Sequence, residues 1–193
     1  LKFFLIQIQE VKLMNEDIKF LSINVAVVTI SDTRTLENDK SGDVLEKRIE
    51  QAGHIVLARE IVQDEFKKIS SLFSNLIKDK KIDVIISTGG TGLTGRDITP
   101  EVMETLFEKS IEGFGEMFRW MSYKKIGTSA LQSRALAGVA NGTYIFCLPG
   151  SPSACRDGWD DILVHQLDIR HKPCNFVEIM PRLQEHKYFR TKN

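Results

Sequence analysis

The sequence predicts an α/β domain with a mostly parallel central β-sheet, and two observations carry this prediction. Strand patterns alternate with helix patterns over the first half of the chain, and a β-hairpin pattern follows in the second half. Alternation at this spacing implies parallel strands that are joined by right-handed crossovers. The length of 193 residues suits a single domain, because one hydrophobic core commonly serves about 100 to 200 residues.

The first half predicts three strands and two helices. Asn24 to Ile30 is a short β-branched apolar run, which is typical of a strand buried on both faces. Apolar residues then recur at helical spacing between Val44 and Ala52, and Gly53 ends this helix. The other expected elements are a strand from His54 to Val62, an amphipathic helix from Phe66 to Ile77 and a strand from Val84 to Ser87.

The second half predicts helices on either side of a hairpin. Thr99 is expected as the N-cap of a helix with Pro100 at its first position. Asn141-Gly142 separates two strand patterns, and this dipeptide suits the two-residue type I′ turn of a β-hairpin. The other expected elements are a helix from Glu112 to Lys124, hairpin strands from Arg134 to Ala140 and from Thr143 to Leu148, and a last helix from Pro152 to about Leu167.

Composition and charge argue against several classes of partner. The 26 Lys and Arg residues balance 26 Asp and Glu residues, whereas proteins that bind nucleic acid through phosphates usually carry a cationic excess. The apolar run from Phe3 to Ile6 is much shorter than the roughly 20 residues that span a bilayer. We therefore expect no nucleic-acid partner and no membrane association. The three cysteines form no Cys-x-x-Cys pair, which favours a cytoplasmic location over a disulfide framework or a zinc site.

The chain is expected to hold one folded domain with a flanking segment at each end. We expect residues 1–20 to form an N-terminal extension outside the core, residues 21–176 to form the α/β domain and residues 177–193 to form a polar C-terminal tail. Met14 lies just ahead of the first strand pattern, which supports an extension over residues 1–13. An ordered N-terminal strand is the alternative.

The most informative stretch is the glycine-rich segment from Ser87 to Pro100. Its Gly-x-Gly-x-x-Gly spacing matches a dinucleotide fingerprint, but that motif needs glycines that open a helix directly, whereas Arg96 to Ile98 intervene here. A Walker A motif would need a lysine where Arg96-Asp97 stands. A glycine-rich turn after a parallel strand still presents backbone N–H groups to a phosphate. The alternative is a tight turn in which Asp97 caps the next helix.

Two carboxylates from separate loops are the candidate catalytic residues. Asp97 would repel a bare phosphate, but it becomes favourable when Mg²⁺ bridges it to phosphate oxygens. Asp64 follows the second strand and Ser31-Asp32 follows the first, so these loops should meet at the sheet edge where open α/β sheets bind ligands. Asp64 would then supply an orienting or general-base group. Taken singly, Asp64 is more often a helix N-cap, and Asp32 is a turn former.

Other candidates carry weaker signals. Pro149-Gly150-Ser151 follows the hairpin and should reach the same edge, although Gly150-Ser151 also suits a helix cap. The four histidines lack the spacing of metal ligands, and the Cys147 and Cys155 thiols have no visible activating partner. Three arginines, Arg119, Arg134 and Arg156, suit an anionic substrate and suit a solvated or salt-bridged role equally well.

Several motifs in the right order resemble the MoaB/MogA family of molybdenum cofactor biosynthesis proteins. The resemblance runs from about Val25 to Phe176, and the segments 130–140 and 166–176 are similar to the MoaB branch in particular. The motifs are the Ser31-Asp32 loop with Asp39-x-Ser41-Gly42, the Ser-Thr-Gly-Gly-Thr-Gly loop with Arg96-Asp97-x-Thr99-Pro100, Glu112-Gly113-Phe114-Gly115-Glu116, and Leu148-Pro149-Gly150-Ser151.

The resemblance implies a three-layer α/β sandwich with a mostly parallel central sheet and a C-terminal β-hairpin, the molybdopterin-binding, MogA-like fold. It also implies a homo-oligomer, either a trimer or a dimer of trimers. The implied reaction is the adenylylation of molybdopterin by Mg-ATP with release of pyrophosphate. By position, Asp64 and Asp97 match the acidic residues important for this reaction, with Asp97 as the Mg²⁺ ligand beside the ATP phosphates. The expected binding residues are Ser31, Asp32, Thr88, Gly89, Gly90, Thr91, Gly92, Pro149, Gly150 and Ser151.

Two functions from different classes are open on the sequence alone. The first is a nucleotidyltransferase, molybdopterin adenylyltransferase. The second is a non-catalytic molybdopterin-binding or assembly protein of the same pathway, which holds its ligand without turning it over. The presence of both Asp64 and Asp97 favours the enzyme, because a protein that only binds a phosphate has no need of two carboxylates beside it.

Overall fold

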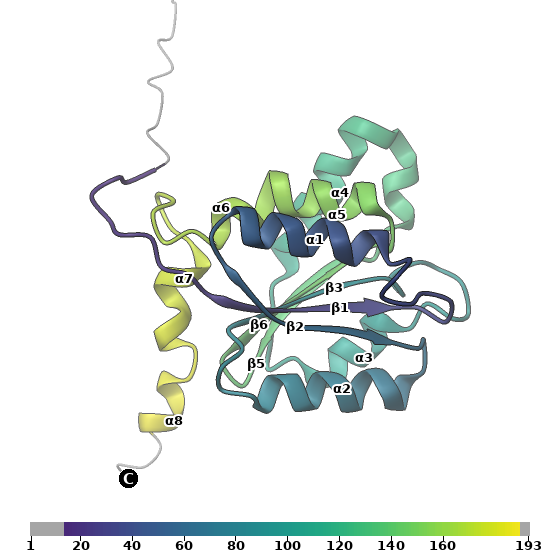
Figure 1. Ribbon diagram of the computed structural model, residues 1–193, viewed down its shortest axis with the longest axis horizontal. Helices are drawn as coiled ribbons and strands as arrows, with labels where there is room; N and C mark the ends of the chain where they lie inside the picture. The colour runs from purple at the N-terminus through teal and green to yellow at the C-terminus, as the bar shows by residue number, and fades with distance from the viewer. Residues whose placement is uncertain (1–13, 190–193) are drawn as a thin grey trace, which may run out of the picture.

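The computed structural model describes residues 14–189 and shows one six-stranded sheet between two layers of helices (Figure 1). The strand order is β2-β1-β3-β6-β5-β4. The first four run parallel, β5 is antiparallel to β6, and β4 is antiparallel to β5. The strands are β1 (Asn24–Ile30), β2 (Ile55–Val62), β3 (Val84–Thr88), β4 (Lys109–Ser110), β5 (Leu136–Ala140) and β6 (Thr143–Leu148).

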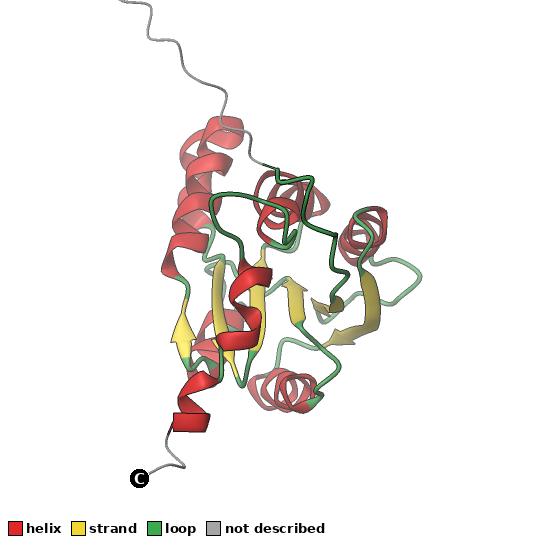
Figure 2. Ribbon diagram, turned by 90° about the vertical axis from the view of Figure 1, so that its left-hand side faces the viewer, coloured by secondary structure: helices red, strands yellow, loops and turns green. Residues whose placement is uncertain are grey.

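The helices cover both faces of the sheet, as Figure 2 shows in a view turned by 90°. The predicted α/β class is therefore confirmed. The helices α1 (Lys40–Gln51), α4 (Glu112–Ile126) and α5 (Pro152–Gly158) pack on one face, whereas α2 (Phe66–Lys78) and α3 (Thr99–Leu106) pack on the other. Residues 1–13, expected to form an extension, lie outside the described residues.

The central strand β1 shows why a continuous apolar run fits this position. Val25 and Val27 enter the core under α1 and α4, whereas Ala26 and Val28 enter the core over α2 and α3. Each Val side chain that is fully buried stabilises the fold by about 1.5–3 kcal/mol. Since both faces of the strand are covered, a polar residue at any of these positions would lose its contact with water.

The hairpin turn has the geometry that its sequence predicts. Asn141 has a φ of 50° and Gly142 a φ of 85°, and a type I′ turn requires a positive φ at both central residues. The turn joins β5 to β6 in an antiparallel register that pairs Ala140 with Thr143. It therefore places β6 beside β3, where the carboxyl end of β6 meets the glycine-rich loop.

Two predicted details of the helices are wrong. Thr99 is not an N-cap, because Ile98 holds that position and Thr99 lies within α3. The Thr99 hydroxyl instead donates to the Gly89 carbonyl at 3.0 Å and ties α3 to the glycine-rich loop. The last predicted helix is interrupted: after α5 the chain forms a π-helical segment, Trp159–Leu163, and a short α6, Val164–Gln166.

The segment after residue 175 packs against the main domain. It forms α7 (Phe176–Ile179), a 3₁₀ turn (Met180–Arg182) and α8 (Glu185–Phe189). Val177 is buried, and Phe176 lies 5.0 Å from Tyr144 between ring centroids. The region expected as a polar tail from residue 177 thus begins with residues that belong to the packed core.

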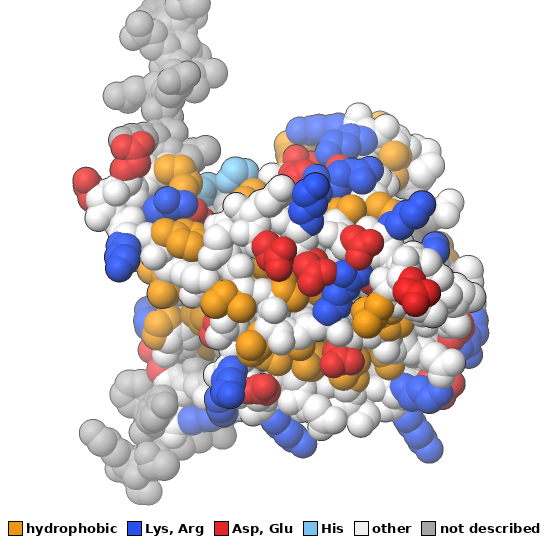
Figure 3. Space-filling model, viewed as in Figure 1, with side chains coloured by type: hydrophobic (Ala, Val, Ile, Leu, Met, Phe, Trp, Pro, Cys, Tyr) orange, Lys and Arg blue, Asp and Glu red, His pale blue; other side chains and the backbone are white. Residues whose placement is uncertain are grey.

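The surface carries charges of both signs, in keeping with the zero net charge (Figure 3). On the face that Figure 3 shows, Lys and Arg side chains alternate with Asp and Glu side chains. Among residues 14–189, no helix has the length and hydropathy needed to cross a bilayer.

Candidate functional site

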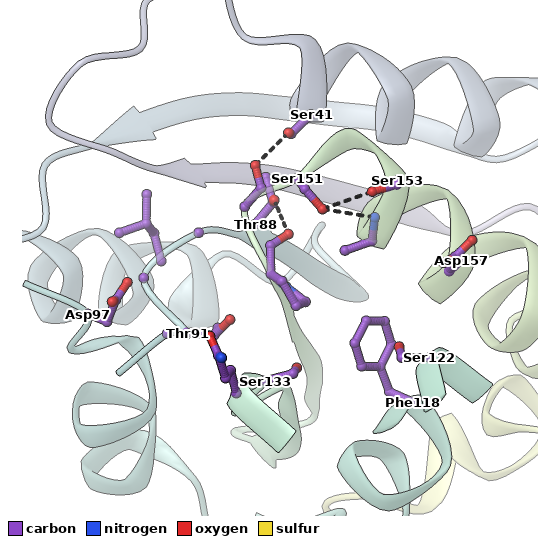
Figure 4. A pocket seen from close by; sticks show the side chains of 18 of the residues that line it. Ser41, Thr88, Thr91, Asp97, Phe118, Ser122, Ser133, Ser151, Ser153 and Asp157 are labelled. Atoms are coloured by element: carbon purple, nitrogen blue, oxygen red, sulfur yellow. Dashed lines mark hydrogen bonds between the residues drawn. The ribbon is translucent and has the colours of Figure 1, made fainter. Parts of the chain in front are cut away.

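A cavity of about 760 Å³ opens at the carboxyl ends of β1, β3 and β6 (Figure 4). The chain folds this way because parallel strands bring the loops that follow them to one edge of the sheet. The three loops contribute residues from Thr29 to Ser31, from Thr88 to Gly92 and from Pro149 to Ser151. Helices α4 and α5 close the opposite side. The volume falls within the range of about 300–1,000 Å³ that is typical of sites for small molecules.

The glycine-rich turn approaches its neighbours so closely that side chains are excluded. Gly89 has a φ of 106° and Gly90 a φ of 63°. A Cβ at Gly89 would collide with the Ile30 carbonyl, and a Cβ at Gly90 would collide with the Thr99 hydroxyl. The turn therefore needs glycine both for its backbone conformation and for its space, and its backbone remains uncovered by side chains on these two residues.

Asp97 lines the cavity and is held by the loop that carries it. Its Oδ2 accepts hydrogen bonds from the backbone N–H of Thr94 at 2.8 Å and from the Thr94 hydroxyl at 2.6 Å. Partial burial alone would raise the pKa of Asp97, but hydrogen bonds from Thr94 and Gly92, together with the charge of Arg134, lower this pKa below its usual value. Asp97 is therefore an oriented, ionised carboxylate. It does not cap α3.

Asp64 lies beside the same turn but does not line the cavity. A Cβ built on Gly90 would lie 2.9 Å from Asp64 Oδ1. Burial raises the pKa of Asp64, the negative charges of Asp32 and Asp97 raise it further, and Arg96 opposes the shift. The N-cap of α2 is Glu65, so the alternative role of Asp64 as a helix cap is excluded. The two sequence-predicted carboxylates thus meet at one edge and interact electrostatically.

Ser31 and Asp32, both expected at the site, have different surroundings. Ser31 lines the cavity. Asp32 instead forms a two-pronged ion pair with Arg96, with Nη2 at 2.7 Å from Oδ2 and Nε at 3.0 Å from the same oxygen. Asp32 Oδ1 also accepts a hydrogen bond from the backbone N–H of Asp64 at 3.2 Å. Asp32 therefore connects two of the loops at the rim.

The segment from Pro149 to Ser151 forms the wall between the turn and α5 (Figure 4). The Thr88 hydroxyl donates to the Pro149 carbonyl at 2.9 Å, and the Ser41 hydroxyl donates to the Gly150 carbonyl at 2.9 Å. Ser151 caps α5, because its hydroxyl accepts a hydrogen bond from the backbone N–H of Ala154 at 3.2 Å. The capping role considered for Ser151 is correct, and the residue lines the cavity as well.

The part of the wall formed by α4 and the following 3₁₀ turn (Gly127–Gln132) was missed by sequence reasoning, whereas Arg156 of α5 was a candidate. A signal was present: Ser122 lies four residues after Phe118 on the buried face of α4, where an apolar residue is the norm. Lys125 joins α4 to α5 through Asp157 at 2.8 Å and to the π-helical segment through Asp161 at 2.7 Å. The lining residues of this wall are Phe118, Ser122, Lys125, Ile126, Ser129, Ala130, Gln132, Ser133, Ser153, Ala154, Arg156 and Asp157.

The three candidate arginines differ in their position relative to the cavity. Arg156 lines the cavity, whereas Arg119 and Arg134 do not. Arg119 donates to the Ala135 carbonyl at 3.2 Å. Arg134 contacts the glycine-rich loop from outside, through the Gly92 and Asp97 carbonyls.

The buried thiols are unsuited to nucleophilic chemistry. Burial raises the pKa of Cys147 to about 12 and the pKa of Cys155 to about 11, and a protonated thiol is a poor nucleophile. Within residues 14–189, no group of three or more His, Cys, Asp or Glu side chains is arranged to hold a metal ion.

Comparisons with known proteins identify the family of this chain. Residues 26–169 match the family described as "Probable molybdopterin binding domain". Molybdenum cofactor biosynthesis protein B of Escherichia coli K12 is 46% identical over 158 residues, which cover 82% of this chain and 93% of that protein.

Solved structures show the same relationship. A crystal structure of molybdenum cofactor biosynthesis protein B has a TM-score of 0.77 at 37% identity. The match covers 86% of this chain and 98% of the chain in that structure. The tungsten cofactor synthesizing protein MoaB from Pyrococcus furiosus has a TM-score of 0.64 at 36% identity, with coverage of 74% and 91%. Sequence and structure together assign this chain to the MoaB family of molybdenum cofactor biosynthesis proteins.

Proposed function

We propose that this protein is a molybdopterin adenylyltransferase, which converts molybdopterin and ATP to adenylyl-molybdopterin and pyrophosphate. The observation that carries the proposal is the cavity in which a side-chain-free glycine turn faces an oriented carboxylate, Asp97, with Asp64 beside the same turn. In this reaction an oxygen of the pterin phosphate attacks the α-phosphorus of ATP. The bond from that phosphorus to the pyrophosphate oxygen breaks, and the electron pair leaves with pyrophosphate.

The chain contributes by holding two anions together. Backbone N–H groups in the turn from Gly89 to Gly92 suit phosphate oxygens, because they carry partial positive charge and meet no side-chain barrier at the glycines. The Thr91 hydroxyl, which lines the cavity, adds a further donor. Phosphoryl transfer needs little covalent help from a protein, so positioning of this kind supplies most of the catalysis.

Asp97 fits a magnesium ion that arrives with the nucleotide. Magnesium in phosphate-transfer sites is usually held by one or two carboxylates plus substrate phosphates, rather than by a complete protein cage. Asp97 is ionised, oriented by Thr94 and on the cavity wall. When bound, Mg²⁺ would neutralise the charge that develops on the departing pyrophosphate.

Asp64 is best suited to an orienting role. A phosphate monoester loses its second proton with a pKa near 6, so the attacking oxygen needs no general base at neutral pH. Asp64 borders Gly90 and interacts with Asp97. We therefore propose that Asp64 helps to hold the turn in place and contributes negative charge near the position of the metal.

We also propose that copies of this chain assemble as a trimer or a dimer of trimers. The support is an apolar surface on α4 formed by Met117, Trp120 and Tyr123. These residues lie at helical spacing, and each is at least half exposed. Sedimentation equilibrium of the wild type and of Trp120→Glu tests this assembly. A monomeric wild type would overturn it, and dissociation of the variant would support it.

The enzymatic proposal is tested by pterin-dependent release of pyrophosphate from Mg-ATP. Wild type should release pyrophosphate, and Asp97→Asn should lose at least 100-fold in rate while it retains pterin binding. Glu50→Gln changes an exposed carboxylate on α1, away from the cavity lining and from the proposed α4 surface, and serves as the control. Tight pterin binding by the wild type without any release would overturn the enzyme and identify a ligand-holding protein. Full activity in Asp97→Asn would overturn the metal assignment.

A further inference from the structure

Arg134 contacts the glycine-rich loop at three points. Its Nε donates to the Gly92 carbonyl at 2.7 Å, and its Nη2 donates to the Asp97 carbonyl at 2.7 Å. Its backbone N–H donates to the Thr91 carbonyl at 3.1 Å. Arg134 lies two residues before β5. One residue outside the cavity thus joins both ends of the 92–97 loop to a separate part of the fold.

The guanidinium of Arg134 is committed to these contacts. Its Nη1 forms an ion pair with Glu101 on α3, so all three nitrogens have partners. The side chain is 29% exposed and does not line the cavity. Direct binding of an anionic substrate, which the sequence left open for this residue, is therefore excluded in this arrangement.

Apart from Arg134, the 92–97 loop is tied to another loop by the exposed ion pair of Arg96 with Asp32, and exposed ion pairs contribute little to stability. Leu93, Thr94, Gly95 and Arg96 are exposed, and none lies in a helix or strand. Exposed irregular segments open easily, because little buried surface opposes their conformational entropy. Among residues 14–189, the hydrogen bonds to the Asp97 carboxylate come from Thr94 and Gly92 of this same loop. Its position relative to the sheet therefore depends on what fixes the loop ends.

We infer that Arg134 is a positioning residue, which holds the 92–97 loop and with it the Asp97 carboxylate in place at the cavity wall. The planar guanidinium contacts two carbonyls of the loop at once, so it fixes both the distance and the direction between them. A single flexible donor would not do so. Misplacement of a reacting group by about 1 Å costs on the order of 100-fold in rate. The kinetic consequence rests on the adenylyltransferase proposed above, whereas the effect on the loop does not.

Four variants distinguish the positioning role of Arg134 from a role of its charge alone and from general stabilisation of the fold. Arg134→Gln removes the charge and both carbonyl contacts. Arg134→Lys keeps the charge but has one donor atom, which cannot replace the two-pronged contact. Glu101→Gln removes only the charge of the ion-pair partner. Arg119→Gln changes another arginine, which donates a hydrogen bond to the Ala135 carbonyl and not to the loop.

Hydrogen exchange of the ligand-free protein gives a measurement that needs no activity. The amides of Thr94 and Asp97, which are bonded within the loop, should exchange at least tenfold faster in Arg134→Gln and Arg134→Lys. Amides of β1 and β3 should keep their wild-type rates. Arg119→Gln and Glu101→Gln should match the wild type within about threefold at the loop.

Pyrophosphate release gives the second measurement. In both Arg134 variants kcat should fall at least tenfold, while the KM for molybdopterin stays within about threefold. Wild-type behaviour of Arg134→Lys in both measurements would overturn the positioning role in favour of charge alone. Loss of structure in the variants, or faster exchange in β1 and β3 as well, would overturn it in favour of a general stabilising role. If the wild type releases no pyrophosphate, the proposed function fails while hydrogen exchange still decides the role of Arg134.

Discussion

Asp32 and Arg96 form a two-pronged ion pair that joins the loop after β1 to the glycine-rich loop after β3. Both charges act on Asp64, whose backbone N–H donates to Asp32. Asp32 raises the pKa of Asp64, and Arg96 lowers it. The pair thus sets the charge balance beside the turn without lining the cavity itself.

Substitutions of the two partners should shift the pKa of Asp64 in opposite directions. Asp32→Asn removes a negative charge and is expected to lower the pKa of Asp64. Arg96→Gln removes a positive charge and is expected to raise it. Carboxyl carbon chemical shifts of Asp64, followed by NMR through a pH titration, measure both changes. Shifts of the same sign in the two variants would contradict the electrostatic account.

The raised pKa of Asp64 also predicts a pH-dependent effect on stability. A carboxyl with a raised folded-state pKa contributes stability that is present below its unfolded pKa and lost as the pH rises through the folded value. Asp64→Asn should therefore increase the free energy of unfolding at pH 7.5, and the gain should shrink as the pH falls toward 4. The gain should stay below about 1 kcal/mol, because solvent screens a partly exposed group.

Urea denaturation at the two pH values measures this gain, with Glu50→Gln as the control for loss of an exposed carboxylate. A gain that is equal at both pH values would show that desolvation of the charge is not its cause. A site residue that costs stability at neutral pH is common where function requires a buried charge.

The periodicity of the sequence identified most of the fold because local pattern and tertiary position agree there. The apolar run of β1 is buried on both faces, and Asn141-Gly142 forms the expected turn. Thr99 was misassigned because a competing acceptor, the Gly89 carbonyl, lies ten residues away in the sequence and is brought near only by folding. Helix caps are local features, and this one is overridden by a tertiary contact.

The contacts at the site are likewise of two kinds, those within one short segment and those that only the fold brings together. Gly92 and Asp97 lie in one loop, so their proximity follows from a short stretch of sequence. The Asp32–Arg96 pair spans 64 positions, and the α4 wall is brought to the cavity by the sheet rather than by the chain. Contacts of this kind depend on strand order, which periodicity does not specify.

Substitution of glycine should be tolerated at one position of the loop and not at another. Gly90→Ala places a Cβ against the Thr99 hydroxyl at a φ of 63°. We expect it to lower the free energy of unfolding by about 1–3 kcal/mol and to lower pyrophosphate release at least tenfold. Gly95→Ala meets nothing within 4 Å and should change stability by less than about 0.5 kcal/mol.

Urea denaturation and the pyrophosphate assay check both glycine variants. Equal effects of Gly90→Ala and Gly95→Ala would contradict the steric account, since only one of the two positions has a blocked Cβ direction and a positive φ.

The packing of the C-terminal segment predicts a stability difference between two tyrosines. The Tyr144 hydroxyl donates to the Phe176 carbonyl at 3.1 Å, and burial raises the pKa of Tyr144 to about 12. Tyr144→Phe leaves that carbonyl without this donor and should cost about 1 kcal/mol of unfolding free energy. Tyr123 on α4 is exposed in the single chain, and Tyr123→Phe keeps the ring that the proposed assembly would cover, so this variant should cost close to nothing. Thermal and urea denaturation compare the pair, and equal losses would exclude a stabilising Tyr144–Phe176 bond.

The three thiols should differ in reactivity because of burial. Cys174 is exposed, whereas Cys147 and Cys155 are buried and have pKa values raised to about 12 and about 11. At pH 8 a thiol with a pKa of about 11 is ionised on the order of one part in a thousand, and only the thiolate attacks a disulfide reagent. Native protein should therefore release one equivalent of thionitrobenzoate from Ellman's reagent rapidly, Cys174→Ser should release none at that rate, and urea-unfolded wild type should release three. Rapid reaction of two or more thiols in the native state would contradict this account, because it would show that Cys147 or Cys155 becomes accessible on the timescale of the assay.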